Sequence, residues 1–167
     1  VETYPEIVSD WERLAYGSIL LETVEALWPE EESQIELFDF LCVVVETLRQ
    51  RSPRITVAAA LWKILEFAGF GIEFDCCVQC GTPLEEGRFS SSEGGIIDNC
   101  AGICVGTECP SSVLEVLKSL QNYPWNEKVQ GVIRGKDLVI AEKVLLEYLT
   151  YQLEKPLKSL QFLQKMK

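Results

Sequence analysis

Cys77-Val78-Gln79-Cys80-Gly81 is the stretch of this sequence that restricts its fold most strongly. Two thiolates on one tight turn can take two corners of a metal tetrahedron, and the glycine that follows lets backbone N–H groups point at the sulfur atoms. A second pair, Cys100 and Cys104, follows after nineteen intervening residues, which is the spacing of a closed four-thiolate zinc site. Cys109 comes close behind as a substitute ligand. The pattern therefore predicts a structural Zn²⁺ ion.

The segment around these cysteines, residues 72–109, is rich in glycine and has too few apolar residues to build a core of its own. A structural zinc ion contributes about 10–16 kcal/mol of apparent binding free energy, which is enough to order such a segment. We expect a zinc ribbon with one short β-hairpin between Cys80 and Cys100. Cys42 is expected in the core of a helical region, and Cys76 is a spare cysteine.

Three other uses of the seven cysteines are less consistent with the sequence. A disulfide framework is typical of small exported proteins, whereas this chain is large enough to fold without cross-links and its cysteine count is odd. A redox C-x-x-C motif normally starts a helix in a βαβ unit, and no strand pattern precedes Cys77. A zinc deaminase is excluded because Gly102 occupies the position of its glutamate and Cys109-Pro110 reverses its Pro-Cys order.

Helical periodicity flanks the cysteine segment on both sides. Apolar residues recur at three- and four-residue steps over about residues 8–28, 33–48, 54–68, 112–120, 137–152 and 157–166. The predicted fold is mainly α. We expect a helical domain in two parts, residues 1–71 and 110–167, with a four-cysteine zinc ribbon inserted at 72–109.

Local signals indicate where some of these helices begin and end. The S-x-x-E pattern occurs at residues 33–36 and 112–115, and it is typical of a capping box that starts a helix. Gly69 and Gly71 are expected to end the third helix in left-handed conformations.

Charge is distributed unevenly along the chain. Of 167 residues, 26 are acidic and 15 basic, and residues 1–46 hold twelve acids and one base, Arg13. That excess of eleven equals the whole net charge of −11. Such a chain is a poor primary binder of nucleic acid, because affinity for DNA comes largely from Lys and Arg contacts that release counterions.

Some functions are excluded by composition. The sequence has no histidine, which excludes Ser-His, Cys-His and His-metal chemistry, and a closed zinc site cannot hold a reacting water. We therefore expect no enzymatic activity. No apolar run reaches the roughly 18 residues that a membrane span needs, so we expect no membrane association.

Three stretches occur in the order of a known family. They are FDCCVQCG at 74–81 after a glycine-ended helix, RFSSSEGGII at 88–97 and EKPLKSLQFL at 154–163. This order resembles the DNA recombination mediator family RecO, over nearly the whole chain but only the C-terminal two thirds of the family. The family's N-terminal oligonucleotide-binding barrel has no counterpart here. Since the sequence starts at Val1 rather than Met, we expect a fragment or a processed piece.

One position departs from the family pattern. Asp98 stands where the family places the first cysteine of its second pair, and Cys100 comes two positions later. Either Cys100 and Cys104 ligate the ion after an insertion in this loop, or Cys109 is recruited.

The resemblance implies a non-enzymatic protein of the bacterial cytoplasm that acts in DNA repair and homologous recombination. Proteins of this family bind RecR and the tail of single-stranded DNA-binding protein, help to load recombinase and anneal strands. DNA would be bound mainly through the missing N-terminal domain. The alternatives are a generic zinc-ribbon interaction module in transcription and, less favoured, a cysteine-dependent redox enzyme.

Two basic spots are candidate partner-binding residues. An acidic tail that ends in apolar residues would suit a basic rim beside an apolar groove. Arg49, Arg51 and Arg54, or Lys155 and Lys158, could provide that rim. The simpler alternative is a solvated helix end, because cations near a helix C-terminus are stabilising by themselves.

Overall fold

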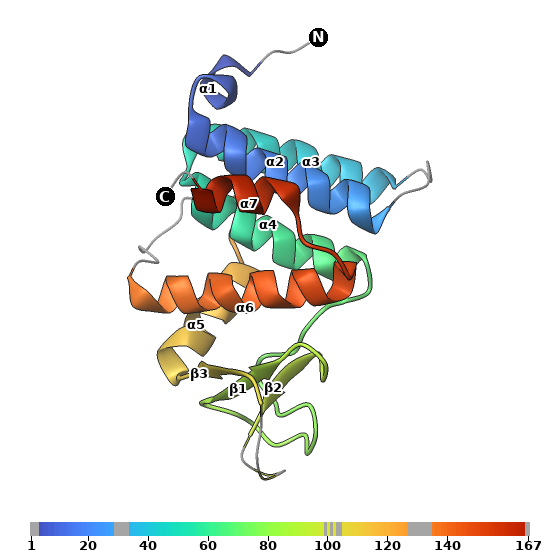
Figure 1. The fold of residues 1–167 in the computed structure, drawn as a ribbon, viewed down its shortest axis with the longest axis vertical. Helices are drawn as coiled ribbons and strands as arrows, with labels where there is room; N and C mark the ends of the chain where they lie inside the picture. The colour runs from blue at the N-terminus through green and yellow to red at the C-terminus, as the bar shows by residue number, and fades with distance from the viewer. Residues whose placement is uncertain are drawn as a thin grey trace.

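A computed structural model describes residues 4–28, 34–98, 100, 102, 105–126 and 135–165 of the chain. In chain order its elements are α1 (Pro5–Val8), α2 (Trp11–Leu27), α3 (Ile35–Gln50), α4 (Pro53–Phe67), β1 (Gly87–Ser90), β2 (Gly95–Ile97), β3 (Thr107–Cys109), α5 (Ser111–Gln121), α6 (Lys136–Leu153) and α7 (Lys158–Lys165). The prediction of a mainly helical protein with a small antiparallel sheet is confirmed (Figure 1). In the part that the structure describes, none of the helices combines the length and the apolar character needed to cross a bilayer.

Helix α4 forms the centre of the helical body, the name used here for α1 to α7. It contacts α2, α3, α5 and α6, and Figure 1 shows α2 and α3 on one side of it and α5 and α6 on the other. Ten of its fifteen residues are buried, which fits a segment, PRITVAAALWKILEF, that is apolar almost all round. Each fully buried Val, Leu or Ile contributes about 1.5–3 kcal/mol relative to an exposed one. Burial of α4 is therefore the main stabilising feature of the body.

Residues 72–109, called the cysteine module below, carry the three-stranded sheet, in the order β2-β1-β3. Strands β1 and β2 form the predicted hairpin, with Phe89 paired to Ile96. Strand β3 is an addition that the sequence did not predict, and it pairs antiparallel with β1 so that Gly87 lies opposite Cys109. Phe89 and Ile96 are almost fully buried. The Phe89 ring lies edge-on to the ring of Tyr148 in α6, with centroids 5.6 Å apart, so the sheet packs on the helical body.

The first predicted helix is in fact two helices. Helix α1 ends at Val8, and Asp10 caps the N-terminus of α2 by accepting hydrogen bonds from the backbone N–H groups of Glu12 at 3.0 Å and Arg13 at 3.3 Å. An aspartate at this position satisfies N–H groups that have no partner within the helix. Helical periodicity in apolar residues continues across the break, and for that reason the sequence suggested one helix.

Two of the predicted helix ends are wrong. Helix α5 starts at Ser111 with Pro110 at its N-cap and no side-chain cap, so the pattern at 112–115 is not a capping box. Gly69 adopts the expected positive φ of 84°, whereas Gly71 does not have a positive φ. Ser33 lies outside the described residues, and α3 begins at Ile35.

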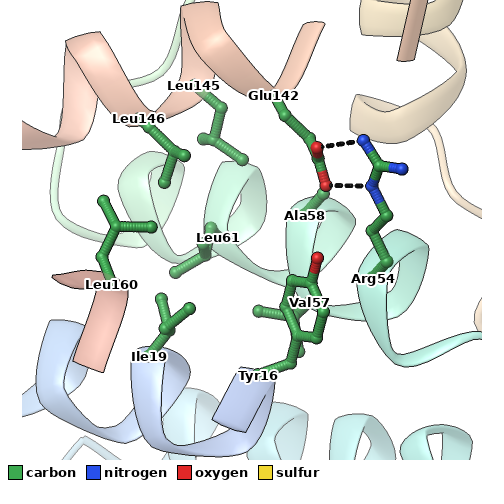
Figure 2. A pocket seen from close by; sticks show the side chains of 10 residues that line it. All are labelled: Tyr16, Ile19, Arg54, Val57, Ala58, Leu61, Glu142, Leu145, Leu146 and Leu160. Carbon is green, nitrogen blue, oxygen red and sulfur yellow. Dashed lines mark hydrogen bonds and ion pairs between the residues drawn. The ribbon is translucent and has the colours of Figure 1, made fainter. Parts of the chain in front are cut away.

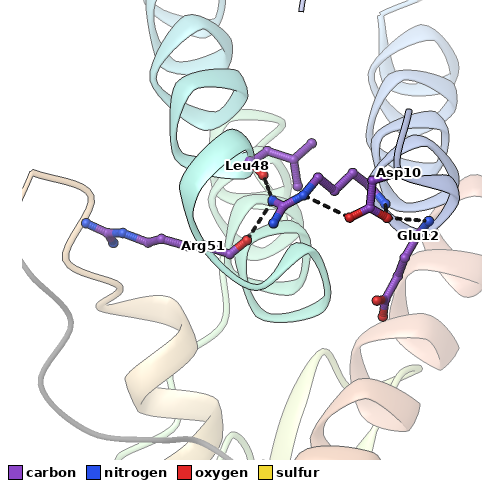
Figure 3. A network of polar contacts seen from close by, with 5 residues as sticks. Asp10, Glu12, Leu48 and Arg51 are labelled. Atoms are coloured by element: carbon purple, nitrogen blue, oxygen red, sulfur yellow. Dashed lines mark hydrogen bonds and ion pairs between the residues drawn. The ribbon is translucent and has the colours of Figure 1, made fainter. Parts of the chain in front are cut away.

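Arg13 ties α2 to the C-terminal end of α3 (Figure 3). Its Nε donates to Asp10 Oδ2 at 3.1 Å, and its Nη1 donates to the backbone carbonyl oxygens of Leu48 and, at 2.9 Å, of Arg51. The last carbonyl groups of a helix have no partner within the helix and carry partial negative charge. The guanidinium therefore satisfies the end of α3 and fixes how α2 lies against it.

Helix α7 is joined to α2 by a carboxylate as well as by apolar contacts of Leu157 and Leu160. Glu22 accepts hydrogen bonds from the backbone N–H groups of Lys158 at 2.9 Å and Ser159 at 2.8 Å, and from the Ser159 hydroxyl. Partial burial disfavours the ionised form, but the hydrogen bonds from Ser159 and Lys158 outweigh it and lower the pKa of Glu22. Leu157, directly before α7, is buried. The carboxylate thus acts as an N-terminal cap supplied by another helix.

Candidate metal centre and the pocket beside Arg54

Three of the predicted zinc ligands lie together. The Sγ atoms of Cys77, Cys80 and Cys100 are all within 4.8 Å of one another, and those of Cys77 and Cys100 are 3.7 Å apart. Four sulfur atoms about 2.3 Å from a zinc ion at the centre of a tetrahedron are separated from each other by about 3.8 Å. The cluster is therefore close to the size of a zinc-thiolate site.

The knuckle of residues 77–81 is held by backbone hydrogen bonds. Gly81 donates to the Cys77 carbonyl at 2.8 Å, and Gly81 has the positive φ of 73° that this turn needs. Val78 donates to the Ile96 carbonyl at 3.0 Å, which ties the knuckle to β2. A Cβ on Gly95 would overlap the Val78 side chain, so a glycine is needed there for the knuckle to approach the hairpin.

Electrostatics in the cluster favour a bound cation. The hydrogen bond that the Asp98 N–H donates to the Cys77 sulfur, helped by backbone N–H groups of Cys80 and Gln79, lowers the pKa of Cys77 to about 6. Hydrogen bonding to Cys80 and Cys77 raises the pKa of Cys100 to about 12. The neighbouring sulfur atoms thus disfavour ionisation of a second thiol in the cluster. A divalent cation removes this opposition, because metal binding replaces the protons on the thiols.

The other cysteines lie in different surroundings. Cys104 is outside the described residues. Cys109 lies apart from the cluster: its side chain is buried, its Sγ donates to the Thr107 carbonyl at 3.5 Å, and burial raises the pKa of Cys109 to about 11. Cys42, expected in the core, is exposed on α3, so that prediction is wrong.

Two of the arginines in the predicted basic spot have contacts within the chain. Arg49 forms ion pairs with Glu46 at 2.7 Å and Glu6 at 3.2 Å. Arg51 donates to the Pro124 carbonyl at 2.9 Å and lies over the Tyr123 ring. Both arginines therefore have a structural role within the chain, and their binding to a partner stays a prediction. Lys155 and Lys158 are exposed, and their role as partner-binding residues likewise stays a prediction.

Arg54 lies beside a cavity of about 130 Å³ between α2, α4, α6 and α7 (Figure 2). The Arg54 Nε donates to Glu142 Oε1 at 2.6 Å and its Nη2 donates to Glu142 Oε2, and these hydrogen bonds raise the pKa of Arg54. The rest of the lining is apolar apart from one tyrosine: Tyr16, Ile19, Val57, Ala58, Leu61, Leu145, Leu146 and Leu160. The sequence did not indicate this pocket, because its two charged residues are 88 positions apart.

A second hollow of about 550 Å³ adjoins the cavity and shares Glu142, Leu146 and Leu160 with it. Its other lining residues are Val139, Lys143, Glu147 and Thr150, so the two hollows form a groove along α6 whose apolar residues are flanked by charges of both signs. Arg54, paired with Glu142, and Lys143 are thus cations beside apolar side chains, and the sequence led us to expect such cations where an acidic peptide that ends in apolar residues binds.

Comparison with known proteins identifies the family of the chain. Residues 8–161 match the family model described as Recombination protein O C terminal. The chain belongs to the RecO family. The matched residues include both the cysteine cluster and the pocket beside Arg54, so both features lie within the RecO part of the chain.

Several DNA repair proteins RecO are similar to this chain. The one from Pelotomaculum thermopropionicum is 34% identical over 173 residues, which cover 98% of this chain and 65% of the relative. Those from Desulforudis audaxviator and Streptomyces coelicolor are 29% and 30% identical and cover 99% and 95% of this chain. The chain spans 64–68% of the length of these three RecO relatives. No solved structure matches the chain.

Proposed function

We propose that this chain is the helical and zinc-binding part of a DNA repair protein that acts as a mediator of homologous recombination without catalysing a reaction itself. The observation that carries the proposal is the match of residues 8–161 to the C-terminal part of RecO. The RecO relatives, which are named as DNA repair proteins, support it. Such a role would place the protein in the bacterial cytoplasm. It would work by holding RecR and single-stranded DNA-binding protein, so that recombinase is loaded and strands are annealed.

The first part of the proposal is a structural Zn²⁺ ion. Cys77, Cys80 and Cys100 would supply three thiolates, and Cys104 is the fourth ligand that the sequence offers. The sulfur separations and the opposition to further negative charge support this assignment. The ion would fix the knuckle relative to the end of β2, and residues 72–109 would form a zinc ribbon between helical parts 1–71 and 110–167. Elemental analysis of the purified protein tests it, with about one zinc per chain expected.

The second part of the proposal assigns the groove beside Arg54 to the acidic tail of single-stranded DNA-binding protein. Glu142 binds the Arg54 Nε and Nη2, and the remaining guanidinium nitrogen points away from the apolar lining (Figure 2), so a peptide carboxylate would reach it from the outer edge of the pocket. Apolar side chains of the tail would fill the cavity lined by Leu61, Leu145 and Leu160. Charge-assisted hydrogen bonds of this kind, next to buried apolar contacts, are typical of strong binding determinants.

Titration of the tail peptide against charge-reversed variants tests this assignment. We expect Arg54→Glu to weaken binding by at least about tenfold, because a contact worth 1.4 kcal/mol corresponds to that factor. Lys63→Glu is the matched control, since Lys63 lies on the same helix, pairs with Glu66 and does not line the pocket. Arg54→Lys keeps the charge but not the fork geometry and should give an intermediate affinity. Equal affinity for wild type and Arg54→Glu would remove the groove from consideration.

The contribution of this chain to DNA binding should be small. Because the net charge is −11, contacts with the phosphate backbone are few, and we assign the main contact with DNA to an N-terminal domain of the whole protein. The isolated chain should bind single-stranded DNA weakly and lose that binding as salt rises. Tight binding that persists at high salt would contradict the assignment.

A further inference from the structure

The clustered thiols allow a second chemistry besides metal binding. The Sγ atoms of Cys77 and Cys100 are 3.7 Å apart, whereas the bond in a disulfide is about 2.05 Å long. An approach of roughly 1.7 Å, within the range of a side-chain rotation, would join the two sulfurs. Cys100 is exposed, so a small oxidant dissolved in water can reach it.

We infer that Cys77 and Cys100 form a reversible oxidation site, at which a hydroperoxide converts the two thiols into one disulfide and so displaces the metal ion. The inference rests on the zinc site proposed above and adds a way to regulate it. Cys77 and Cys100 would be two of the ion's four ligands. Once both sulfurs are in a disulfide, two thiolates remain, and the ion leaves as Zn²⁺ without a change of oxidation state.

The chemistry balances in two steps. In the zinc-loaded chain the metal has replaced the proton of Cys100, so its sulfur is a thiolate. This thiolate attacks the O–O bond of the hydroperoxide and becomes a sulfenic acid, and the other oxygen leaves as water or an alcohol after taking up a proton. The Cys77 thiolate then attacks the Cys100 sulfur, so that an S–S bond forms and the S–O bond breaks with loss of water. Two electrons pass from the two sulfurs to the hydroperoxide. A dithiol reductant reverses the reaction by thiol–disulfide exchange.

Of the other described cysteines, Cys42, Cys76 and Cys109 lie outside the cluster, and Cys80 is the one that competes with this pair. Cys109 is buried and donates to a backbone carbonyl, and Cys42 is on α3, outside the cluster. Cys80 belongs to the cluster, and its Sγ is 3.0 Å from the Thr82 hydroxyl. A Cys77–Cys100 disulfide would also join the knuckle to the chain after β2, as the ion would. The oxidised module would therefore stay folded and bind zinc again after reduction.

The test is an oxidation of the zinc-loaded chain with hydrogen peroxide in the presence of a chromogenic chelator. We expect one zinc released per chain, the loss of two hydrogen atoms from the mass, and a Cys77–Cys100 linkage in the peptide map. A dithiol reductant with added zinc should restore metal content. Cys42→Ser is the control and should behave as wild type, whereas Cys100→Ser should give no linkage at Cys77.

Other results would overturn the inference. A linkage of Cys77 to Cys80, or sulfinic acids in place of a disulfide, would show that the pair is not the oxidation site. If the chain binds no zinc when zinc is added, the proposed metal site fails on its own. Oxidation of the metal-free wild type then decides the inference separately: a Cys77–Cys100 linkage supports the pair as an oxidation site, and its absence refutes it.

Discussion

The helical body and the cysteine module reach an ordered structure by different means. The body surrounds α4, which is apolar on nearly all sides, with four other helices. The module instead places its sheet on α6 of the body through Phe89, and its knuckle is fixed by backbone hydrogen bonds and clustered thiols. The body therefore supplies the core for both regions, and the proposed ion is needed only at the cysteine cluster.

Metal removal should separate the two regions most clearly. With a strong chelator, we expect backbone N–H groups of the knuckle, residues 77–81, to exchange hydrogen rapidly, because structural zinc contributes about 10–16 kcal/mol of apparent binding free energy. Helix α4 should keep its protection, since its contacts do not involve the cluster. Hydrogen exchange followed by mass spectrometry measures both regions at once. Equal loss of protection in α4 and in the knuckle would show that the body depends on the ion as well.

Phe89→Ala should have the next largest effect, because it removes the contact through which the module uses the core of the body. Phe89 is 1% exposed, and we expect a loss of about 3–5 kcal/mol in the free energy of unfolding. Phe38→Ala is the matched control, because Phe38 is 66% exposed on α3, and its effect should stay within about 0.5 kcal/mol. Denaturant unfolding measures both variants. Similar effects at the two positions would contradict the docking of the sheet on α6.

Arg54→Ala tests a contact within the body. It leaves Glu142, whose side chain is 16% exposed, without its partner, and we expect a loss of about 1–3 kcal/mol. The double variant that combines Arg54→Met with Glu142→Leu should lose less free energy of unfolding than the sum of the losses in the two single variants, since no unpaired charge remains. Thermal or denaturant unfolding of the four proteins gives the coupling. If the losses in the single variants add up to the loss in the double variant, Arg54 and Glu142 do not stabilise the fold through their mutual contact.

The smallest expected effect concerns the attachment of α7 through Glu22. Since the pKa of Glu22 is lower in the folded chain than its ordinary value of 4.5, its contribution is fully present above pH 4.5 and is lost as the pH falls through the lowered value. Glu22→Gln should cost about 0.5–1 kcal/mol at pH 7. Melting of both proteins between pH 7 and pH 3 measures this. A difference that stays constant over the whole range would contradict the role of the ionised carboxylate.

The sequence predicts local features of this fold better than long-range contacts. Periodicity locates most of the helices, and Cys77-Val78-Gln79-Cys80-Gly81 predicts the knuckle, because these signals lie within one turn or one helix. The third strand was missed, since Thr107–Cys109 is short and its partner β1 lies about twenty residues earlier. Pairing between such distant segments leaves no periodic pattern.

The candidate site shows the same limit. The pairing of Arg54 with Glu142 depends on how α4 packs against α6, and residue spacing carries no information about it. The exposure of Cys42 has a similar cause: apolar periodicity places it near the inner face of α3, but the face that α3 presents to α4 is set by Leu37, Val44 and Leu48. Helix orientation within a bundle is a tertiary property.

X-ray absorption at the zinc edge tests the central claim most directly. On purified chain loaded with zinc, we predict one zinc ion surrounded by four sulfur atoms at about 2.3 Å. A chain that takes up no zinc, or an ion surrounded mainly by oxygen atoms, would contradict the claim that thiolates of the cysteine module hold a structural metal.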